Sequence, residues 1–164
     1  YYSFDWGQAH FIIINTDLGN VALSKTAKEA FWAEQKRWME DDLAKAQKAE
    51  FRFVIMHNPP FTAMKRRRSG NKHVQALVPL WEKYQVSATF GGHDHNYQHH
   101  LKNGIHHIVT GGGGAPLYAL DSLIEGITLK VESIEHFVRL KVEPGKATVE
   151  AVALDGRIIE SFDL

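Results

Sequence analysis

Two histidines separated by a single residue, His93 and His95, have the spacing of a metal-binding pair. They lie in the segment GGHDHNYQHH, residues 91–100, directly after the apolar run at residues 86–90. In an extended chain, side chains two residues apart point to the same side, so both imidazoles can face one point. Neutral imidazole is the commonest metal ligand in proteins, and the two preceding glycines permit a sharp turn. The segment alone also fits a polar loop whose histidines only form hydrogen bonds.

A third histidine, His57, stands at the end of another apolar run. Residues 51–56 read FRFVIM, a β-rich pattern that is typical of a buried strand. The sequence Asn-Pro-Pro that follows His57 then ends regular structure. Binding sites of open α/β sheets collect at the carboxyl ends of strands. We therefore expect His57, His93 and His95 to meet at one edge of a sheet as metal ligands.

The motifs H-N-P-P, from residue 57, and G-H-D-H-N-Y, from residue 92, resemble the C-terminal half of a calcineurin-like metallophosphoesterase, in the style of the purple acid phosphatase-like branch. The resemblance covers nearly the whole chain. It implies that His57 and His93 bind the second ion of a two-metal centre and that His95 binds the first. It also implies hydrolysis of a phosphate ester with two divalent or trivalent ions (Fe, Zn or Mn) and a secreted or periplasmic location.

Three further motifs of that family, D-x-H, G-D-x-x-D and G-N-H-D/E, are absent from the sequence. They would supply the remaining ligands, including the bridging aspartate. We therefore interpret residues 1–164 as a single unit, the C-terminal part of a metallophosphoesterase domain whose N-terminal half is missing. The resemblance implies an α/β (α+β) fold in which mixed β-sheets with flanking helices form half of a four-layer α/β/β/α sandwich. The metal site of this chain would then be partial or empty, and the chain alone would be inactive.

A polar loop at residues 62–72 carries the basic run KRRR. A solvated surface is the usual fate of a short charge run. The alternative is an anion patch that draws phosphate esters to the metals, with Arg68 as the candidate substrate-binding residue. In the resembled phosphatases this loop often carries a histidine that protonates the leaving group. His73 is the candidate for that catalytic role, against a merely solvated histidine at a helix start.

Three other polar residues near the histidine pair have expected roles. Asp94 lies between two ligands, so its side chain should point away from them and fix the loop. His99 and His100 could orient ligands as second neighbours of the metal, but exposed loop histidines are the favoured interpretation. Four glycines at residues 111–114 permit close backbone packing beside the site.

The elements that position these residues follow from periodicity and turn signals. A helix is predicted from an N-cap at Thr26 to about Ala49, because Thr26 and Glu29 fit a capping box. A second helix is predicted over residues 72–84, with a kink at Pro79. The buried stripe of the first helix is expected at Phe31, Trp38, Met39, Leu43 and Ala46. The predicted strands are residues 1–4, 10–15, 51–56, 86–90, 104–110 and 127–131, followed by an antiparallel meander at 136–142, 147–154 and 157–162.

The composition excludes several other functions. Lys and Arg together number 19, as do Asp and Glu, so no net charge favours a nucleic-acid or membrane partner. No apolar run approaches the roughly 18 residues of a membrane span. The chain has no cysteine, so any metal must take nitrogen and oxygen donors.

Two questions of function stay open. The chain could be a non-catalytic module, either a pseudo-enzyme or a binding domain with a structural metal site. Nucleic-acid binding through KRRR is only weakly supported, because the sequence shows no wider basic face.

The strands at residues 11–14 and 53–56 are so apolar that we expect another sheet to cover them. We therefore predict self-association or pairing with the missing N-terminal half.

Overall fold

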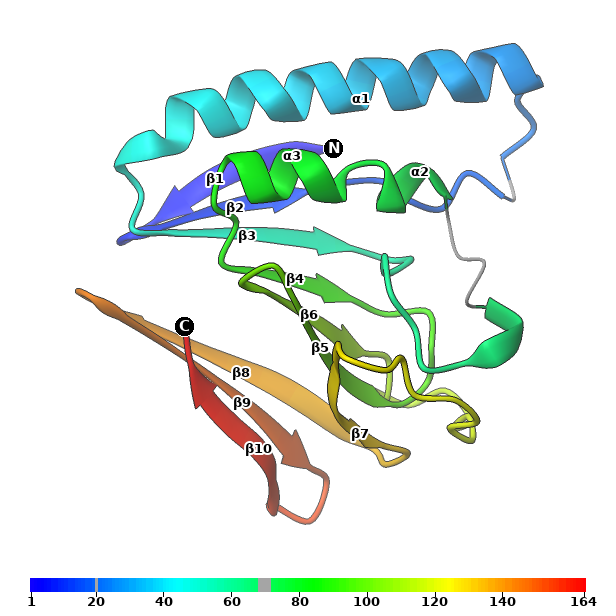
Figure 1. Ribbon diagram of the computed structural model, residues 1–164, viewed down its shortest axis with the longest axis vertical. Helices are drawn as coiled ribbons and strands as arrows, with labels where there is room; N and C mark the ends of the chain where they lie inside the picture. Colours follow the sequence, from blue (N-terminus) through cyan, green and yellow to red (C-terminus); the bar gives the residue numbers. More distant parts are fainter. Residues whose placement is uncertain (20, 68–71) are drawn as a thin grey trace.

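The computed structural model describes residues 1–19, 21–67 and 72–164. A seven-stranded mixed sheet forms the middle of the molecule, in the order β1-β2-β3-β4-β6-β5-β7 (Figure 1). Strands β2, β3, β4 and β6 are parallel, and β1 and β5 run antiparallel to their neighbours. The strands are β1 (Tyr2–Trp6), β2 (Ala9–Ile13), β3 (Phe51–Met56), β4 (Ala88–Gly91), β5 (Tyr97–Lys102), β6 (Ile105–Thr110) and β7 (Thr128–Glu132).

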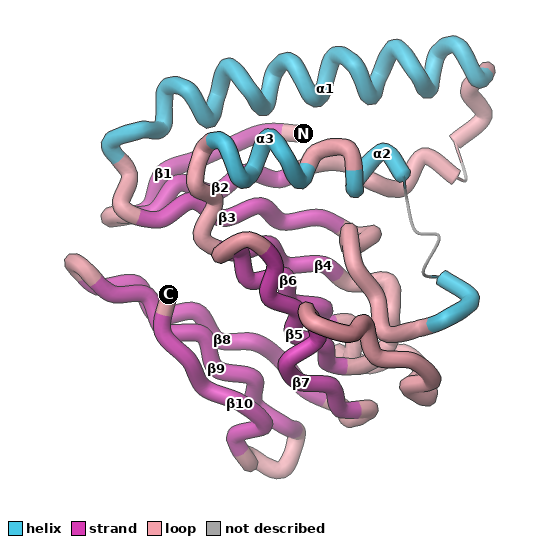
Figure 2. The backbone as a smooth tube through the Cα atoms, viewed as in Figure 1, coloured by secondary structure: helices cyan, strands magenta, loops and turns pink. Residues whose placement is uncertain are grey.

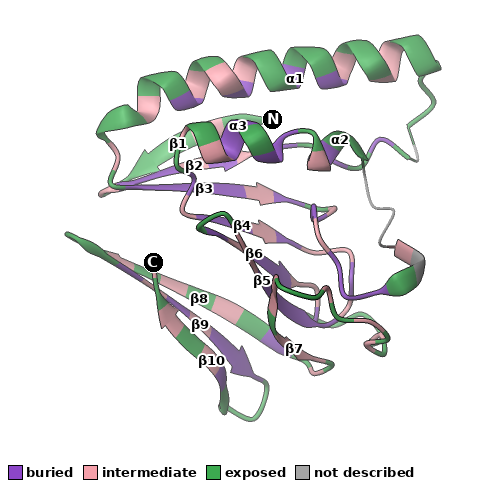
Figure 3. Cartoon of the chain, viewed as in Figure 1, coloured by how far each residue is buried: buried purple, intermediate pink, exposed green. Residues whose placement is uncertain are grey.

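Helices cover one face of this sheet (Figure 2). They are α1 (Lys25–Lys45), α2 (Lys72–Gln75) and α3 (Val78–Lys83), with short 3-10 turns η1 (Ala46–Lys48) and η2 (Lys65–Arg67). Residues of all three helices pack on β2 and β3 in one hydrophobic cluster. Strand β3 is consequently buried over most of its length (Figure 3).

The N-terminus of α1 differs from the prediction. The N-cap is Ser24, not Thr26, because the Ser24 hydroxyl accepts a hydrogen bond from the amide of Ala27 at 3.1 Å. Met39 and Leu43 are buried as predicted, whereas Phe31, Trp38 and Ala46 are only half-buried. Their places against the sheet are taken by Trp32 and by Gln35, whose amide is satisfied by the backbone of Asn15.

The predicted single helix over residues 72–84 is two short helices. Pro79 lies in the first turn of α3, where a missing amide donor costs nothing. The chain therefore breaks between Gln75 and Val78 instead of kinking at the proline.

The predicted C-terminal meander is confirmed. Strands β8 (His136–Glu143), β9 (Lys146–Ala153) and β10 (Ile158–Asp163) form a three-stranded antiparallel sheet. This small sheet packs on the face of the large sheet opposite the helices (Figure 2). The α/β fold of mixed sheets and flanking helices is therefore the one predicted.

The small sheet covers only part of that face. Beyond it, alternate side chains of β1 stay exposed, namely Tyr2, Phe4 and Trp6. An apolar cavity of about 460 Å³ also opens between the sheets, with Phe11, Ile55, Phe90, Phe137 and Leu140 on its walls. The meander of this chain thus supplies part of the covering sheet that was expected over the apolar strands. No helix among the described residues is both long and apolar enough to cross a membrane.

Candidate metal centre

The histidines lie at the carboxyl ends of two neighbouring parallel strands. His57 directly follows β3, and residues 92–96 directly follow β4 (Figure 1). The amide of Gly92 donates to the carbonyl of His57 at 2.9 Å, which ties the two strand ends together. A Cβ on Gly91 would lie 3.0 Å from the Cβ of Pro59, so a glycine is needed there for close approach.

His57 and His93 meet across this junction. The Nε2 atom of His57 lies 3.1 Å from the Nδ1 atom of His93. Zinc–nitrogen bonds of about 2.0–2.1 Å place two nitrogens in adjacent positions on one ion roughly 3.0–3.4 Å apart. The pair therefore already has the spacing of two ligands on a shared ion. Burial lowers the pKa of His93, with help from the charge of Arg67 and from His57, which favours the neutral ring that a metal requires.

The turn that carries His93 is not the extended pair predicted from the spacing. The amide of Asp94 donates to the carbonyl of Gly92 at 2.7 Å, which closes a three-residue turn centred on His93. His93 itself has a φ of 66°, whereas neither Gly91 nor Gly92 has a positive φ. The histidine, not a glycine, thus adopts the left-handed conformation, a kind of strain that collects at functional sites.

His95 turns away from that pair, toward residues 116–118. Its Nδ1 donates to the carbonyl oxygen of Pro116 at 2.8 Å, and its ring stacks on Tyr118 with centroids 4.0 Å apart. In the neutral ring a proton on Nδ1 leaves the lone pair on Nε2, the tautomer of a metal-binding histidine whose other nitrogen is held by a backbone carbonyl. Within residues 1–19, 21–67 and 72–164, no three His, Asp or Glu side chains gather closely enough to hold one ion.

Asp94 fixes the loop, as expected. Its carboxylate is 1% exposed and accepts hydrogen bonds from the hydroxyl of Thr62, from Arg67 at 3.0 Å and from Gln98 at 3.3 Å. Gly111 packs against the same turn, since a Cβ on it would overlap the carbonyl oxygen of Asp94. The prediction for the glycine run therefore holds at Gly111.

Comparison with known proteins gives this geometry a family context. No family model matches the chain. Probable inactive purple acid phosphatase 9 of Arabidopsis thaliana is 28% identical over 103 residues, which cover 60% of this chain and 14% of that protein. Tartrate-resistant acid phosphatase type 5 of Oryctolagus cuniculus is 35% identical over 82 residues, 48% of this chain and 24% of that protein. The homologues of this chain are purple acid phosphatases.

Solved structures give the same fold. The purple acid phosphatase PPD1 from yellow lupin (Lupinus luteus) seeds superposes with a TM-score of 0.78 at 23% identity, over 99% of this chain and 32% of that one. GAP50 of Plasmodium, the anchor in the inner membrane complex, also superposes with a TM-score of 0.78 at 22% identity. The match covers 99% of this chain and 52% of that one. At these identities the likeness speaks for the fold alone. The chain spans 14% to 24% of the curated relatives it matches.

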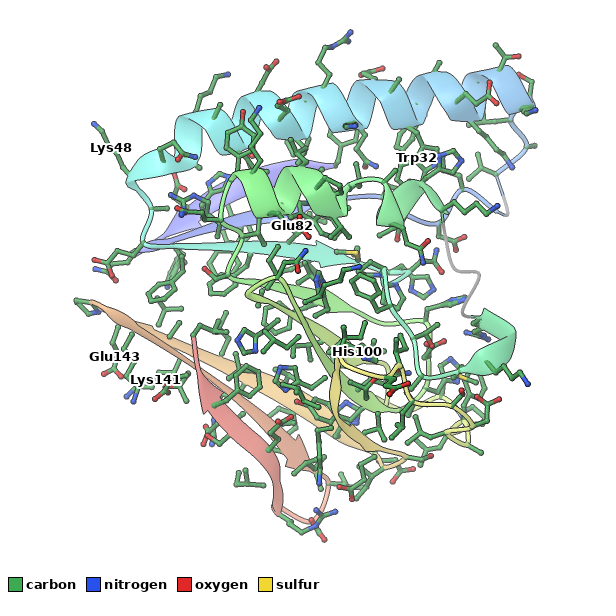
Figure 4. The ribbon with its side chains drawn as sticks, viewed as in Figure 1. Trp32, Lys48, Glu82, His100, Lys141 and Glu143 are labelled. Carbon is green, nitrogen blue, oxygen red and sulfur yellow. The ribbon has the colours of Figure 1, made fainter. Side chains whose placement is uncertain are left out.

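The two remaining predicted site residues have different outcomes. His73 lies in α2 and stacks on Trp32, with centroids 5.0 Å apart and planes 9° apart; Figure 4 shows Trp32 between α1 and α2. Both rings line a cavity of about 290 Å³ that also takes in Asn58, the neighbour of His57. His73 thus lies near the metal-side edge, and its catalytic role stays a prediction. Arg68 lies outside the described residues.

Two residues of this site were missed by sequence reasoning. Arg67, in η2, donates to the backbone of His93 and to Asp94. Tyr118 stacks on His95 from the stretch between the glycine run and residue 127, for which no helix or strand was predicted. The basic run drew attention to the neighbourhood of Arg67, but only the fold reveals which arginine reaches the histidines.

The interpretation of His99 and His100 as exposed loop residues was wrong. Both lie in β5 and are at most 1% exposed, and Figure 4 shows His100 inside the molecule. His99 pairs with Glu160 of the small sheet at 3.0 Å and with His106 at 2.8 Å, while His100 contacts the hydroxyl of Thr128 at 3.0 Å. His99 thus ties the large sheet to the small one, whereas His100 bonds within the large sheet, to Thr128 and to Gln98, whose amide also donates to Asp94.

Proposed function

We propose that the protein to which this chain belongs hydrolyses phosphate esters at a two-metal centre. In this proposal His57 and His93 bind one ion and His95 binds the other. The observation that carries it is the 3.1 Å separation of two ring nitrogens at the ends of adjacent parallel strands. The purple acid phosphatase relatives support the same reaction class.

The donor set fits metal ions only in part. Two nitrogens stand at ligand spacing and the carbonyl of Pro116 orients a third ring, while no three His, Asp or Glu side chains among the described residues gather around one point. When bound, a pair of ions supplies Lewis-acid activation of water and of the phosphoryl group. The residues of this chain orient the ligand nitrogens, and burial lowers the pKa of His93. Further donors must come from elsewhere, so the chain alone should be a poor catalyst.

A non-catalytic module is the second candidate. Two of the relatives carry the words "probable inactive" in their names. Such a module would keep the histidine turn as a structural or vestigial metal site. The two candidates differ in turnover, not in fold, so only chemistry separates them.

The test has two arms. The 164-residue chain is assayed with a chromogenic phosphate ester and added Zn²⁺, Mn²⁺ or Fe²⁺, and its metal affinity is measured by titration. We expect weak binding and almost no turnover, because two or three histidines rarely hold a divalent ion tightly without further donors. Robust turnover would overturn the need for outside ligands. A longer protein that carries D-x-H and G-N-H ahead of Tyr1 but fails to hydrolyse the ester would favour the module.

We also propose that another sheet covers the exposed side of β1 and the apolar opening between the sheets. Tyr2, Phe4 and Trp6 lie on that side, and the opening is lined mainly by apolar side chains. The cover would be either a second copy or further chain of the same protein. A secreted or periplasmic location stays a prediction from the resemblance.

A further inference from the structure

We propose that Arg67 is a positioning residue that holds His93 and His95 in fixed relation to each other. The proposal rests on the metal-binding function proposed above and assigns a role within that site. Arg67 belongs to the basic run that sequence reasoning divided between a solvated surface and an anion patch. Its contacts indicate a third role.

The first contacts of Arg67 are with the His93 turn. Its Nη1 atom donates to the carbonyl oxygen of His93 at 2.9 Å and to the Oδ1 atom of Asp94 at 3.0 Å. The Asp94 side chain is 1% exposed and that of Arg67 is 27% exposed. One guanidinium nitrogen therefore bonds both to the carbonyl of His93, the residue with the positive φ, and to the carboxylate of the next residue, Asp94. A hydrogen bond to a buried carboxylate is charge-assisted and strong.

The second contact reaches His95 through an aromatic ring. The guanidinium carbon of Arg67 lies 4.9 Å from the centre of the Tyr118 ring, within cation–π range. Tyr118 stacks in turn on His95, and its amide donates to the His95 carbonyl at 2.9 Å. Arg67 thus connects His93 on one side with His95 on the other, through a hydrogen bond and through Tyr118.

Electrostatics alone argue against an arginine in this place. A fixed positive charge beside a cation site repels the metal, so its removal should tighten binding. A positioning role predicts the opposite, because loss of the contacts lets the His93 turn and the Tyr118 loop relax. Residues that orient metal ligands typically contribute about 10–100-fold to metal affinity. The sign of the change therefore separates the two accounts.

The test compares Arg67→Met with Lys65→Met in the 164-residue chain. Lys65 is an exposed residue of the same 3-10 turn, so its removal takes away the same charge without the contacts. Co²⁺ affinity is measured by titration of its visible absorption. We expect Arg67→Met to weaken binding about tenfold or more, with Lys65→Met unchanged or slightly tighter. Unchanged or tighter binding in Arg67→Met overturns the proposal.

A metal-free readout keeps this proposal apart from the proposed function. In the wild-type chain, NMR of the His95 ring should show a fixed Nδ1–H tautomer and a ring-current shift from Tyr118. Arg67→Met should average both signals. Arg67→Lys keeps the charge but lacks the planar fork, so it should restore them only in part, and it serves if Arg67→Met does not fold. A wild-type chain that binds no Co²⁺ would contradict the proposed metal site. Unchanged His95 signals in both variants would contradict the positioning role of Arg67.

Discussion

The Nε2 atom of His57 faces the Nδ1 atom of His93 across 3.1 Å, and the two rings meet edge to face with planes 78° apart. At this distance one ring can donate a hydrogen bond to the other, and an ion that took the place of the shared proton would find both nitrogens at ligand spacing. If the pair binds an ion as proposed, little ordering of these two side chains is needed, which lowers the entropic cost of binding.

Replacing either member of the pair should remove most metal affinity. His57→Ala or His93→Ala leaves one nitrogen at that point, so titration with Zn²⁺ should show at least a tenfold loss. In a longer, active protein either change should abolish ester hydrolysis. His57 is exposed, so its loss should change the free energy of unfolding by less than about 1 kcal/mol. His73→Ala is the control, since a leaving-group acid does not bind metal; equal loss in that variant would show that the ligand assignment is wrong.

Gly111→Ala should destabilise the chain strongly. The added methyl group would overlap the carbonyl oxygen of Asp94, a backbone atom that cannot move without disturbing the histidine turn. We expect a loss of about 2 kcal/mol or more in the free energy of unfolding, measured with urea. Gly113→Ala is the matched control in the same run, because nothing lies within 4 Å of a Cβ there. Similar stability of the two variants would mean that the loop does not rest on residue 111.

Stability should fall as the pH is lowered from neutral. Burial lowers the pKa of His107 to about 3, and that of His106 to about 4, from an ordinary value of 6.5. Below pH 6.5 the unfolded chain takes up protons that the folded chain refuses, so folding loses free energy as the pH falls toward those values. For His107, which is 1% exposed, the slope is at most about 1.4 kcal/mol per pH unit.

The interval between pH 6.5 and 5 tests this dependence, because carboxyl groups contribute little there. Urea unfolding at several pH values gives the free energy of unfolding as a function of pH. We expect that free energy to fall less steeply with pH in His107→Gln than in the wild type. An identical slope in the variant would mean that His107 already carries its proton in the folded chain.

The chain should associate through the side of β1 that faces away from α1. Trp6 is 76% exposed and Phe4 is 44% exposed, and Phe4 stacks on Phe11 next to the apolar opening. Light scattering should report dimers or larger species at micromolar concentration, and Phe4→Lys or Trp6→Lys should reduce them. Leu154→Lys is the control, because Leu154 is 79% exposed but lies in the β9–β10 turn. A strictly monomeric wild type without dye-binding surface would contradict the prediction.

Sequence patterns predicted those parts of the fold in which local chemistry and burial agree. The meander was predictable because its strands alternate and because Gly145 and Gly156 occupy turn positions with φ of 73° and 87°. Strand β3 and its terminal histidine were predictable because a continuous apolar run needs cover on both faces. Convergence of strand ends then placed His57 beside residues 92–96.

Patterns failed where polar side chains are buried. Strand β5 reads YQHHLK, which looks like a loop, yet Tyr97 and His99 reach Glu160 while Gln98 and His100 bond on the other face. Such a strand is stable only because residues far along the chain form hydrogen bonds with its buried polar side chains. The positive φ of His93 also depends on tertiary contacts, as does the identity of the arginine that contacts the histidine turn, Arg67. No local sequence pattern could therefore predict either feature.

The position of β5 has a consequence for how the histidine turn can move. Strand β4 pairs with one side of β6 and β5 with the other, so residues 92–96 must pass over the end of β6, where the amide of Gly111 donates to Asn96. Both ends of the segment are anchored in the same sheet, and neither can lift without strand separation. The amide hydrogens of Asp94 and Asn96 should therefore exchange with solvent deuterium as slowly as those of the core strands, unlike an ordinary surface loop.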